Sequence, residues 1–191
     1  MKRFVIAVVS FLFLASAVAT AQVDTYKNSI YLTYGGLGLT EVAYFLGTAL
    51  IGVPAIAIAG DNADIELRMS GNIQFGYARS VTKWLWVGGD LGYEHLGIRA
   101  SGSDGVSESG ADVCTLTASA KADWFRRNKL AMYSKLSAGI LGVLNQDDPS
   151  VVPAFNITVF GVEGGSPRVR GVIELGVGYS VSVAAGVRYR F

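Results

Sequence analysis

The sequence has few of the residues that build metal sites, disulfide frameworks and charged surfaces. Its 191 residues include one Cys, one His and four Pro. A single Cys excludes a disulfide framework and a Cys-rich zinc or iron–sulfur site, and a single His leaves little room for a histidine metal site. Because 16 Lys and Arg nearly balance 15 Asp and Glu, the net charge gives no electrostatic basis for binding nucleic acid.

Charge of either sign is also scarce. Charged residues make up 16% of the chain, against about 25% in typical soluble domains. Hydrophobic residues reach 51%, there are 24 Gly, and the mean hydropathy is +0.39. This composition excludes a disordered chain and disfavours an ordinary cytosolic enzyme. A membrane protein or an unusually apolar secreted protein remains.

The first 21 residues have the pattern of a secretory signal peptide. Two basic residues, Lys2 and Arg3, precede an apolar run that ends at Val18, and small residues precede a predicted cleavage site after Ala21. We therefore expect a single mature domain, residues 22–191, that leaves the cytoplasm. An uncleaved N-terminal anchor is the alternative.

A second apolar segment, from Val42 to Gly60, carries no charge and is long enough to cross a bilayer. Gly47, Gly52 and Pro54 interrupt it, and a proline near the middle disfavours a continuous helix. We expect a short helix from Glu41 to Leu50 inside a long first loop. A membrane helix is the alternative.

The rest of the chain alternates between apolar and polar or small side chains with a period of two. This period is typical of a β-strand, because a helix with 3.6 residues per turn would mix the two sets. A phase change near Val159 indicates a β-bulge in one of the strands. Counting two less regular runs, the pattern predicts eight strands, which begin near Ile30, Ile65, Leu85, Cys114, Leu130, Phe155, Ile173 and Val183.

The connections between these strands alternate in length. Three are expected to be short polar turns: Ser80 to Lys83, Arg126 to Asn128 and Gly164 to Pro167. Three are expected to be longer loops: Thr40 to Asn62, Ala100 to Asp112 and Asn145 to Pro153. The connection from Tyr179 to Ser182 is an exception, since it is short where a longer loop would fit the alternation. Short turns at one end and long loops at the other are typical of an up-and-down barrel in an outer membrane, with the turns on the periplasmic side.

The period does not reveal which face points inward. Apolar side chains point inward in a soluble barrel such as a lipocalin and outward in a membrane barrel. The polar face is rich in Gly and Ala, which suits a narrow interior, and aromatic residues lie near strand ends as in interfacial girdles: Tyr77, Trp124, Tyr189, Phe191, Tyr93 and Tyr179. The polar face also carries charges that could pair across a lumen: Arg68, Lys121, Lys135, Arg188, Arg190, Glu66, Asp90, Glu94, Asp123 and Glu174. These features favour the membrane.

The chain ends with Gly-Val-Arg-Tyr-Arg-Phe, in which Val187, Tyr189 and Phe191 occupy alternate positions. This ending resembles the terminal strand signal of Gram-negative outer-membrane barrels. With the signal peptide and eight strands, the chain is similar to the small barrels of the OmpX and OmpA-transmembrane-domain type, although the long apolar first loop is atypical of OmpX. The resemblance implies contact with outer-membrane lipid and lipopolysaccharide. It also implies recognition of the last strand, ending at Phe191, by the barrel-assembly machinery.

One histidine could support catalysis. Some outer-membrane barrels are lipid-modifying enzymes that use a His with a Ser or Asp, and Ser101, Ser103 and Asp104 are near His95 in the sequence. Glu94 is badly placed to orient His95, because adjacent strand residues point to opposite faces. We expect His95 to be an interfacial residue at the extracellular rim.

Two further features are expected to be structural. Cys114 lies on the apolar face and is expected to be a small lipid-facing residue. Glu174 and Arg188 are expected to form a buried pair on neighbouring strands that fills the lumen. A selectivity ring for ions is the alternative for this pair.

The sequence thus predicts an all-β, eight-stranded antiparallel up-and-down transmembrane β-barrel in the outer membrane. We expect a structural or surface-interaction role, a monomer, no catalytic residue, no cofactor, no metal site and no nucleic-acid partner. The alternatives are a narrow porin-like channel for ions or small solutes, a lipid-modifying enzyme and a soluble lipocalin-like binder.

Overall fold

The computed structural model describes residues 26–36, 38, 42, 64–102, 105–144, 150–179 and 182–191. They form eight strands: β1 (Asn28–Gly36), β2 (Asp64–Ser80), β3 (Leu85–Gly102), β4 (Gly105–Arg126), β5 (Leu130–Leu144), β6 (Ser150–Gly165), β7 (Val169–Gly178) and β8 (Val183–Arg190). The expected signal peptide lies outside the described residues, as does the helix predicted from Glu41 to Leu50 apart from Val42. Within the described part, no helix is long and apolar enough to cross a membrane.

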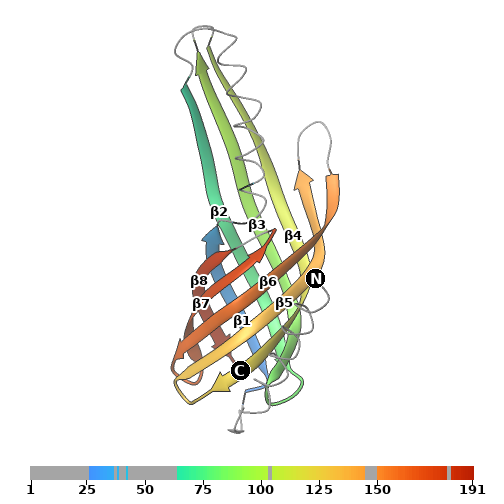
Figure 1. Cartoon of the computed structure of the whole chain (residues 1–191), viewed down its shortest axis with the longest axis vertical. Helices are drawn as coiled ribbons and strands as arrows, with labels where there is room; N and C mark the ends of the chain where they lie inside the picture. The colour runs from blue at the N-terminus through green and yellow to red at the C-terminus, as the bar shows by residue number, and fades with distance from the viewer. Residues whose placement is uncertain are drawn as a thin grey trace, which may run out of the picture.

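The strands form one closed barrel in chain order (Figure 1). Each strand is antiparallel to its neighbours, and β8 returns to pair with β1, where Tyr31 lies opposite Arg188. Closure leaves no unpaired sheet edge around the barrel wall. The predicted eight-stranded up-and-down barrel is confirmed.

Three connections at one end of the barrel are short, as predicted. They comprise residues 81–84, 127–129 and 166–168. Backbone hydrogen bonds close them: the N–H of Arg127 donates to the carbonyl of Leu130 at 2.7 Å, and the N–H of Ser166 donates to that of Val169 at 2.9 Å. We call this end the turn end and the opposite end the loop end.

At the loop end two predicted loops are too long. The segment from Ala100 to Asp112 was expected to be a loop, but β3 and β4 pair as far as Gly102 and Gly105. Figure 1 shows β2, β3 and β4 extending beyond the other strands. The Ser, Gly and acidic composition misled the prediction, because the ladder is formed by backbone hydrogen bonds, which do not require alternating apolar side chains.

The second correction concerns Pro153, which lies within β6 opposite Ile140 rather than in a loop. Pairing of β6 with β7 begins only at Asn156. The missing N–H of the proline therefore removes no hydrogen bond from the β6–β7 ladder.

The burial of side chains alternates along the strands with the predicted phase. On β5, Tyr133, Lys135 and Ser137 are buried, whereas Leu136 and Ile140 are exposed on the outer face. The same inversion holds on β3, β4, β7 and β8. The side chains of Glu66 and Arg68 lie outside the described ones.

One expected outer aromatic residue, Tyr179, is partly buried at the loop end and contacts side chains of both faces. Tyr179 packs against an apolar cluster of Leu96, Val113, Leu141 and Ala154 inside the loop end of the barrel. Its ring also meets that of Phe155 edge-on, at 5.2 Å between centroids.

β-Bulges in three strands, β2, β4 and β6, adjust their phase. The β6–β7 register shifts between Thr158 and Phe160, so Val159 and Phe160 are both exposed; the predicted bulge is confirmed. The β2–β3 register shifts between Met69 and Asn72. Gly71 lies in that bulge with a φ of +71°, a conformation that glycine adopts without steric cost.

Interior glycines make room for two tyrosine rings. A Cβ on Gly76 would overlap the ring of Tyr31, and a Cβ on Gly161 would overlap that of Tyr133. Both tyrosines are buried. A glycine-rich inner face therefore lets a narrow barrel hold large side chains, as the composition predicted.

Candidate functional site

The interior of the barrel is lined by ionised side chains, and we treat this lining as the candidate site. Ten charged residues are buried there, five of each sign: Lys121, Lys135, Arg170, Arg188, Arg190, Asp90, Glu94, Asp123, Glu163 and Glu174. Burying a charged side chain is costly unless a charge of opposite sign lies close to it, and equal numbers of the two signs allow such pairing.

Glu163 of β6 is the centre of the largest group. Its Oε1 lies 2.7 Å from Nζ of Lys121 and 3.2 Å from Nη1 of Arg188. Its Oε2 accepts a hydrogen bond of 2.5 Å from Nη2 of Arg190. Since Lys121 is on β4 and the two arginines are on β8, this carboxylate ties together strands that are not neighbours in the barrel wall.

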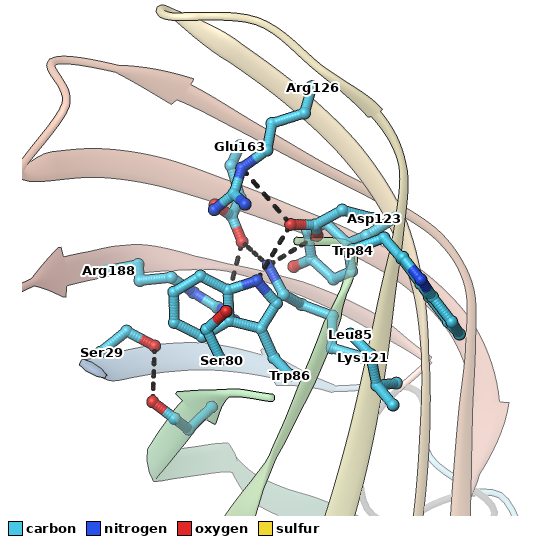
Figure 2. A network of polar contacts seen from close by, with 12 residues as sticks. Ser29, Ser80, Trp84, Leu85, Trp86, Lys121, Asp123, Arg126, Glu163 and Arg188 are labelled. Carbon is cyan, nitrogen blue, oxygen red and sulfur yellow. Dashed lines mark hydrogen bonds and ion pairs between the residues drawn. The ribbon is translucent and has the colours of Figure 1, made fainter. Parts of the chain in front are cut away.

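Asp123 of β4 extends this group toward the turn end (Figure 2). Its carboxylate lies 2.9 Å from Nζ of Lys121 and accepts a hydrogen bond of 3.1 Å from Nε1 of Trp86. Three cations surround the Trp86 ring, each 5.3 Å from its centroid: Lys121, Arg126 and Arg190. The buried indole thus acts both as a donor and as a cation–π partner.

A second group lies next to the first, around Glu174 of β7. Its carboxylate lies 3.1 Å from Nζ of Lys135 on β5. The hydroxyl of Tyr133 donates to Oε1 at 2.6 Å. Arg188 connects the two groups, because its guanidinium lies 5.7 Å from the centroid of the Tyr133 ring and forms an ion pair with Glu163.

A third contact crosses the lumen at Asp90 of β3. The hydroxyl of Tyr31, on β1, donates to Oδ1 of Asp90, and Ser137, on β5, donates to Oδ2 at 3.1 Å. Like the two groups above, Asp90 connects strands that are separated by another strand. The carboxylates of Glu163, Glu174 and Asp90 therefore all form cross-strand contacts, and the arrangement holds the wall in one shape.

The prediction that Glu174 and Arg188 are buried is confirmed, but the prediction that they pair with each other is wrong. Glu174 pairs with Lys135 and Arg188 with Glu163. In the β7–β8 register Arg188 lies opposite Arg170, and Glu174 lies opposite Ala184. Parity along a strand gives the face of a residue but not its height relative to the next strand, and height decides which charges meet.

Sequence reasoning missed Glu163 and Arg170 as interior charges. The bulge after Thr158 reverses the parity of the rest of β6, which turns Glu163 inward. The phase change near Val159 is visible in the sequence. After it, the odd-numbered residues of β6 face inward, and this rule locates Glu163. The inward position of Arg170 was not predicted, because Arg170 lies before Ile173, where the clear alternation begins.

His95 lies at the loop end and has a partner that the sequence did not identify. Its Nδ1 lies 2.7 Å from Oδ1 of Asp112, a residue that was assigned to a loop. The hydroxyl of Tyr93 donates to the same oxygen at 2.9 Å. Asp112 is the one side-chain partner of the imidazole among the residues that the structure describes. The side chains of Ser101, Ser103 and Asp104 are not among those described.

Cys114 lies on β4 opposite Tyr93 and is partly buried. In the part of the chain that the structure describes, no group of three or more His, Cys, Asp or Glu side chains could hold a metal ion.

The similarities of this chain to known proteins are to solved structures. No protein-family model and no curated protein matches the chain. Among solved structures, the chain is similar to the crystal structure of the N-terminal β-barrel domain of Pseudomonas aeruginosa OprF. The two share 11% sequence identity with a TM-score of 0.46, and the alignment covers 87% of this chain and 100% of that one.

Proposed function

We propose that the chain is an integral outer-membrane β-barrel with a structural or surface-interaction role and no catalytic activity. The distribution of side chains carries this proposal. Five basic and five acidic side chains are buried in the lumen, whereas all eight strands expose large aliphatic or aromatic side chains on the outer face. This is the reverse of a soluble barrel.

The size of the charge effect supports lipid as the medium around the barrel. Moving one Lys or Arg to the lipid-facing surface at the bilayer midplane costs about 2–4 kcal/mol. A folded domain is stable by only about 5–15 kcal/mol, so the inward placement of these charges is a condition for folding in a membrane. Closure of the barrel supports the same medium, since an open edge in lipid would leave backbone groups unpaired.

The contacts inside the barrel support a structural role over conduction. Ion pairs from β4 to β6, from β6 to β8 and from β5 to β7 run across the lumen. An eight-stranded barrel has an interior only wide enough for side chains. In planar bilayers the refolded protein should give no steady conductance; a reproducible ohmic step would favour the porin-like channel.

The family resemblance adds partners that stay predictions. Outer-membrane lipid and lipopolysaccharide would surround the barrel. The assembly machinery would read the last strand, whose Val187, Tyr189 and Phe191 are all exposed on the outer face. Replacing Phe191 by Ala should then slow assembly in cells without changing stability of the refolded barrel.

Cell fractionation combined with gel electrophoresis tests the proposal. The protein should stay with outer membranes after washing with carbonate and with salt, and unboiled samples should migrate differently from boiled ones. Release by either wash would favour the soluble lipocalin-like binder. Labelled phospholipid or lipopolysaccharide should stay unmodified; turnover that is lost in His95→Ala would overturn the non-catalytic role.

A further inference from the structure

Exposed basic residues gather at the turn end. Lys27 and Arg79 lie where β1 begins and β2 ends, and the others lie in the three short connections. These basic residues lie around the rim rather than in one patch, since they come from the paired ends of β1 and β2 and from the β2–β3, β4–β5 and β6–β7 connections. We call this set the basic collar; it consists of Lys27, Arg79, Lys83, Arg127, Lys129 and Arg168.

Acidic residues do not accompany the collar. Every Asp or Glu whose side chain the structure describes is buried in the lumen, with the exception of Asp112 at the loop end. The connecting sequences of the loop end, residues 37–63, 103–104 and 145–149, contain Asp and Glu but no Lys or Arg. The two ends of the barrel are therefore opposite in charge type.

Aromatic side chains lie beside the collar. The Nε of Arg168 donates to the hydroxyl of Tyr26 at 3.1 Å, and its guanidinium lies 5.7 Å from the ring centroid. Arg127 lies 5.6 Å from the ring of Phe125. The apolar outer face begins next to these residues, where Val169 is half exposed. Cations that follow the edge of an apolar band, with aromatic rings at the same level, match the boundary between acyl chains and headgroups.

We propose that the basic collar binds the phosphates of anionic phospholipids in the leaflet around the turn end. The inference rests on the proposed function, because it needs an embedded barrel. Lys and Arg near a membrane surface are attracted to anionic headgroups, and a distributed ring fits surrounding lipid better than one compact soluble anion. The acidic loop end would be repelled by the same headgroups, so the collar also favours one orientation of the barrel.

The tryptophans make the proposal testable without a label. Trp84 and Trp124 lie at the turn end and are partly exposed, whereas the third, Trp86, is buried in the lumen. Bromine on acyl chains quenches tryptophans that touch lipid. The refolded protein would be placed in vesicles of phosphatidylcholine with either brominated phosphatidylglycerol or brominated phosphatidylcholine, and the ratio of the two binding constants would be measured.

The expected ratio favours phosphatidylglycerol several-fold at low salt and falls as salt is raised, since one basic residue near a surface contributes at most roughly a fivefold change. The variant Arg79→Gln/Arg127→Gln/Arg168→Gln removes three of the six cations of the collar and should bring the ratio markedly closer to one. The matched Arg→Lys triple variant should keep the preference, as should Arg99→Gln, which removes one cation near the loop end. Heat-modifiability of each variant verifies that the barrel is closed.

The outcomes separate this proposal from the proposed function. Quenching by both lipids with equal affinity would overturn the collar while leaving an embedded barrel. A preference that the Gln triple variant leaves unchanged, or that Arg99→Gln abolishes, would also overturn it. Absence of quenching by either lipid would overturn the embedded barrel itself.

Discussion

The two halves of the lumen are built from different side chains. The half near the turn end holds the ionised groups around Asp123, Glu163 and Glu174, which join strands that are not neighbours. Toward the loop end the lining consists mainly of hydroxyls and amides, with the buried carboxylate of Glu94 opposite Asn72, and then of the apolar cluster of Leu96, Val113, Leu141 and Ala154.

The two halves also differ in what their buried polar side chains contact. In the ionic half, Asp123, Lys135, Arg188 and Arg190 each form an ion pair. In the half near the loop end, the hydroxyl of Thr33, both amide atoms of Asn72 and the amide oxygen of Asn156 are buried without a hydrogen-bond partner among the described residues. Such atoms need water or another polar group. The comparison teaches that the ionic half fixes the shape of the barrel, whereas the other half tolerates change.

The largest effect is expected where one carboxylate serves three cations. Glu163→Gln keeps the shape of the side chain but leaves Lys121, Arg188 and Arg190 buried without their shared anion. Breaking a buried ion pair in this way costs about 3–5 kcal/mol. The free energy of unfolding in lipid vesicles, measured by denaturant titration, should fall by that amount. A loss below about 1 kcal/mol would contradict the central role of Glu163.

A somewhat smaller effect is expected at the second ionic group. Lys135→Met removes the cation but leaves Glu174 with hydrogen bonds from Tyr133 and Thr158, so the cost should be about 3 kcal/mol. The double variant Lys135→Met/Glu174→Leu should be more stable than Lys135→Met alone, because no unpaired charge remains. Simple addition of the two single effects in the cycle would show that these residues do not interact.

The indole of Trp86 is expected to contribute less than either carboxylate. Trp86→Phe keeps an aromatic ring but loses the hydrogen bond to Asp123, and a bond to a charged group contributes about 1.5–3 kcal/mol. The same denaturant titration measures the loss. An unchanged stability would mean that Asp123 is satisfied by Lys121 and Arg126 alone.

The smallest effect is expected near the loop end. Thr33→Val replaces a hydroxyl that has no described partner by a methyl group, so stability should stay within about 0.5 kcal/mol or rise slightly. A loss of more than about 1 kcal/mol would show that the Thr33 hydroxyl is hydrogen-bonded in solution. The two halves of the lumen would then differ less than their described contacts indicate.

The sequence predicted the fold because a period of two is present over part of every strand, although two of the runs are less regular. It placed Lys121, Asp123 and Lys135 on the inner face correctly, since parity depends only on local geometry. It did not predict which charges pair, because the relative height of neighbouring strands depends on the stagger of the closed barrel. Glu163 was missed for a related reason: the bulge in β6 reverses parity.

The extent of strands beyond the barrel was also out of reach. Between Ala100 and Asp112 the alternation ends, yet the β3–β4 ladder continues, because backbone hydrogen bonds form a ladder without a hydrophobic pattern. This is why Asp112 was assigned to a loop and its contact with His95 was not foreseen.

Spin-label accessibility along β5 tests the inverted barrel most directly. In a Cys114→Ser background, single cysteines at positions 133–140 would carry a nitroxide, and collisions with lipid-soluble oxygen and with a water-soluble nickel complex would be compared in vesicles. We expect oxygen accessibility to be high at positions 136, 138 and 140 and low at 133, 135 and 137. The opposite phase, with nickel reaching the label at 136 and 138 as in a water-exposed face, would contradict the account.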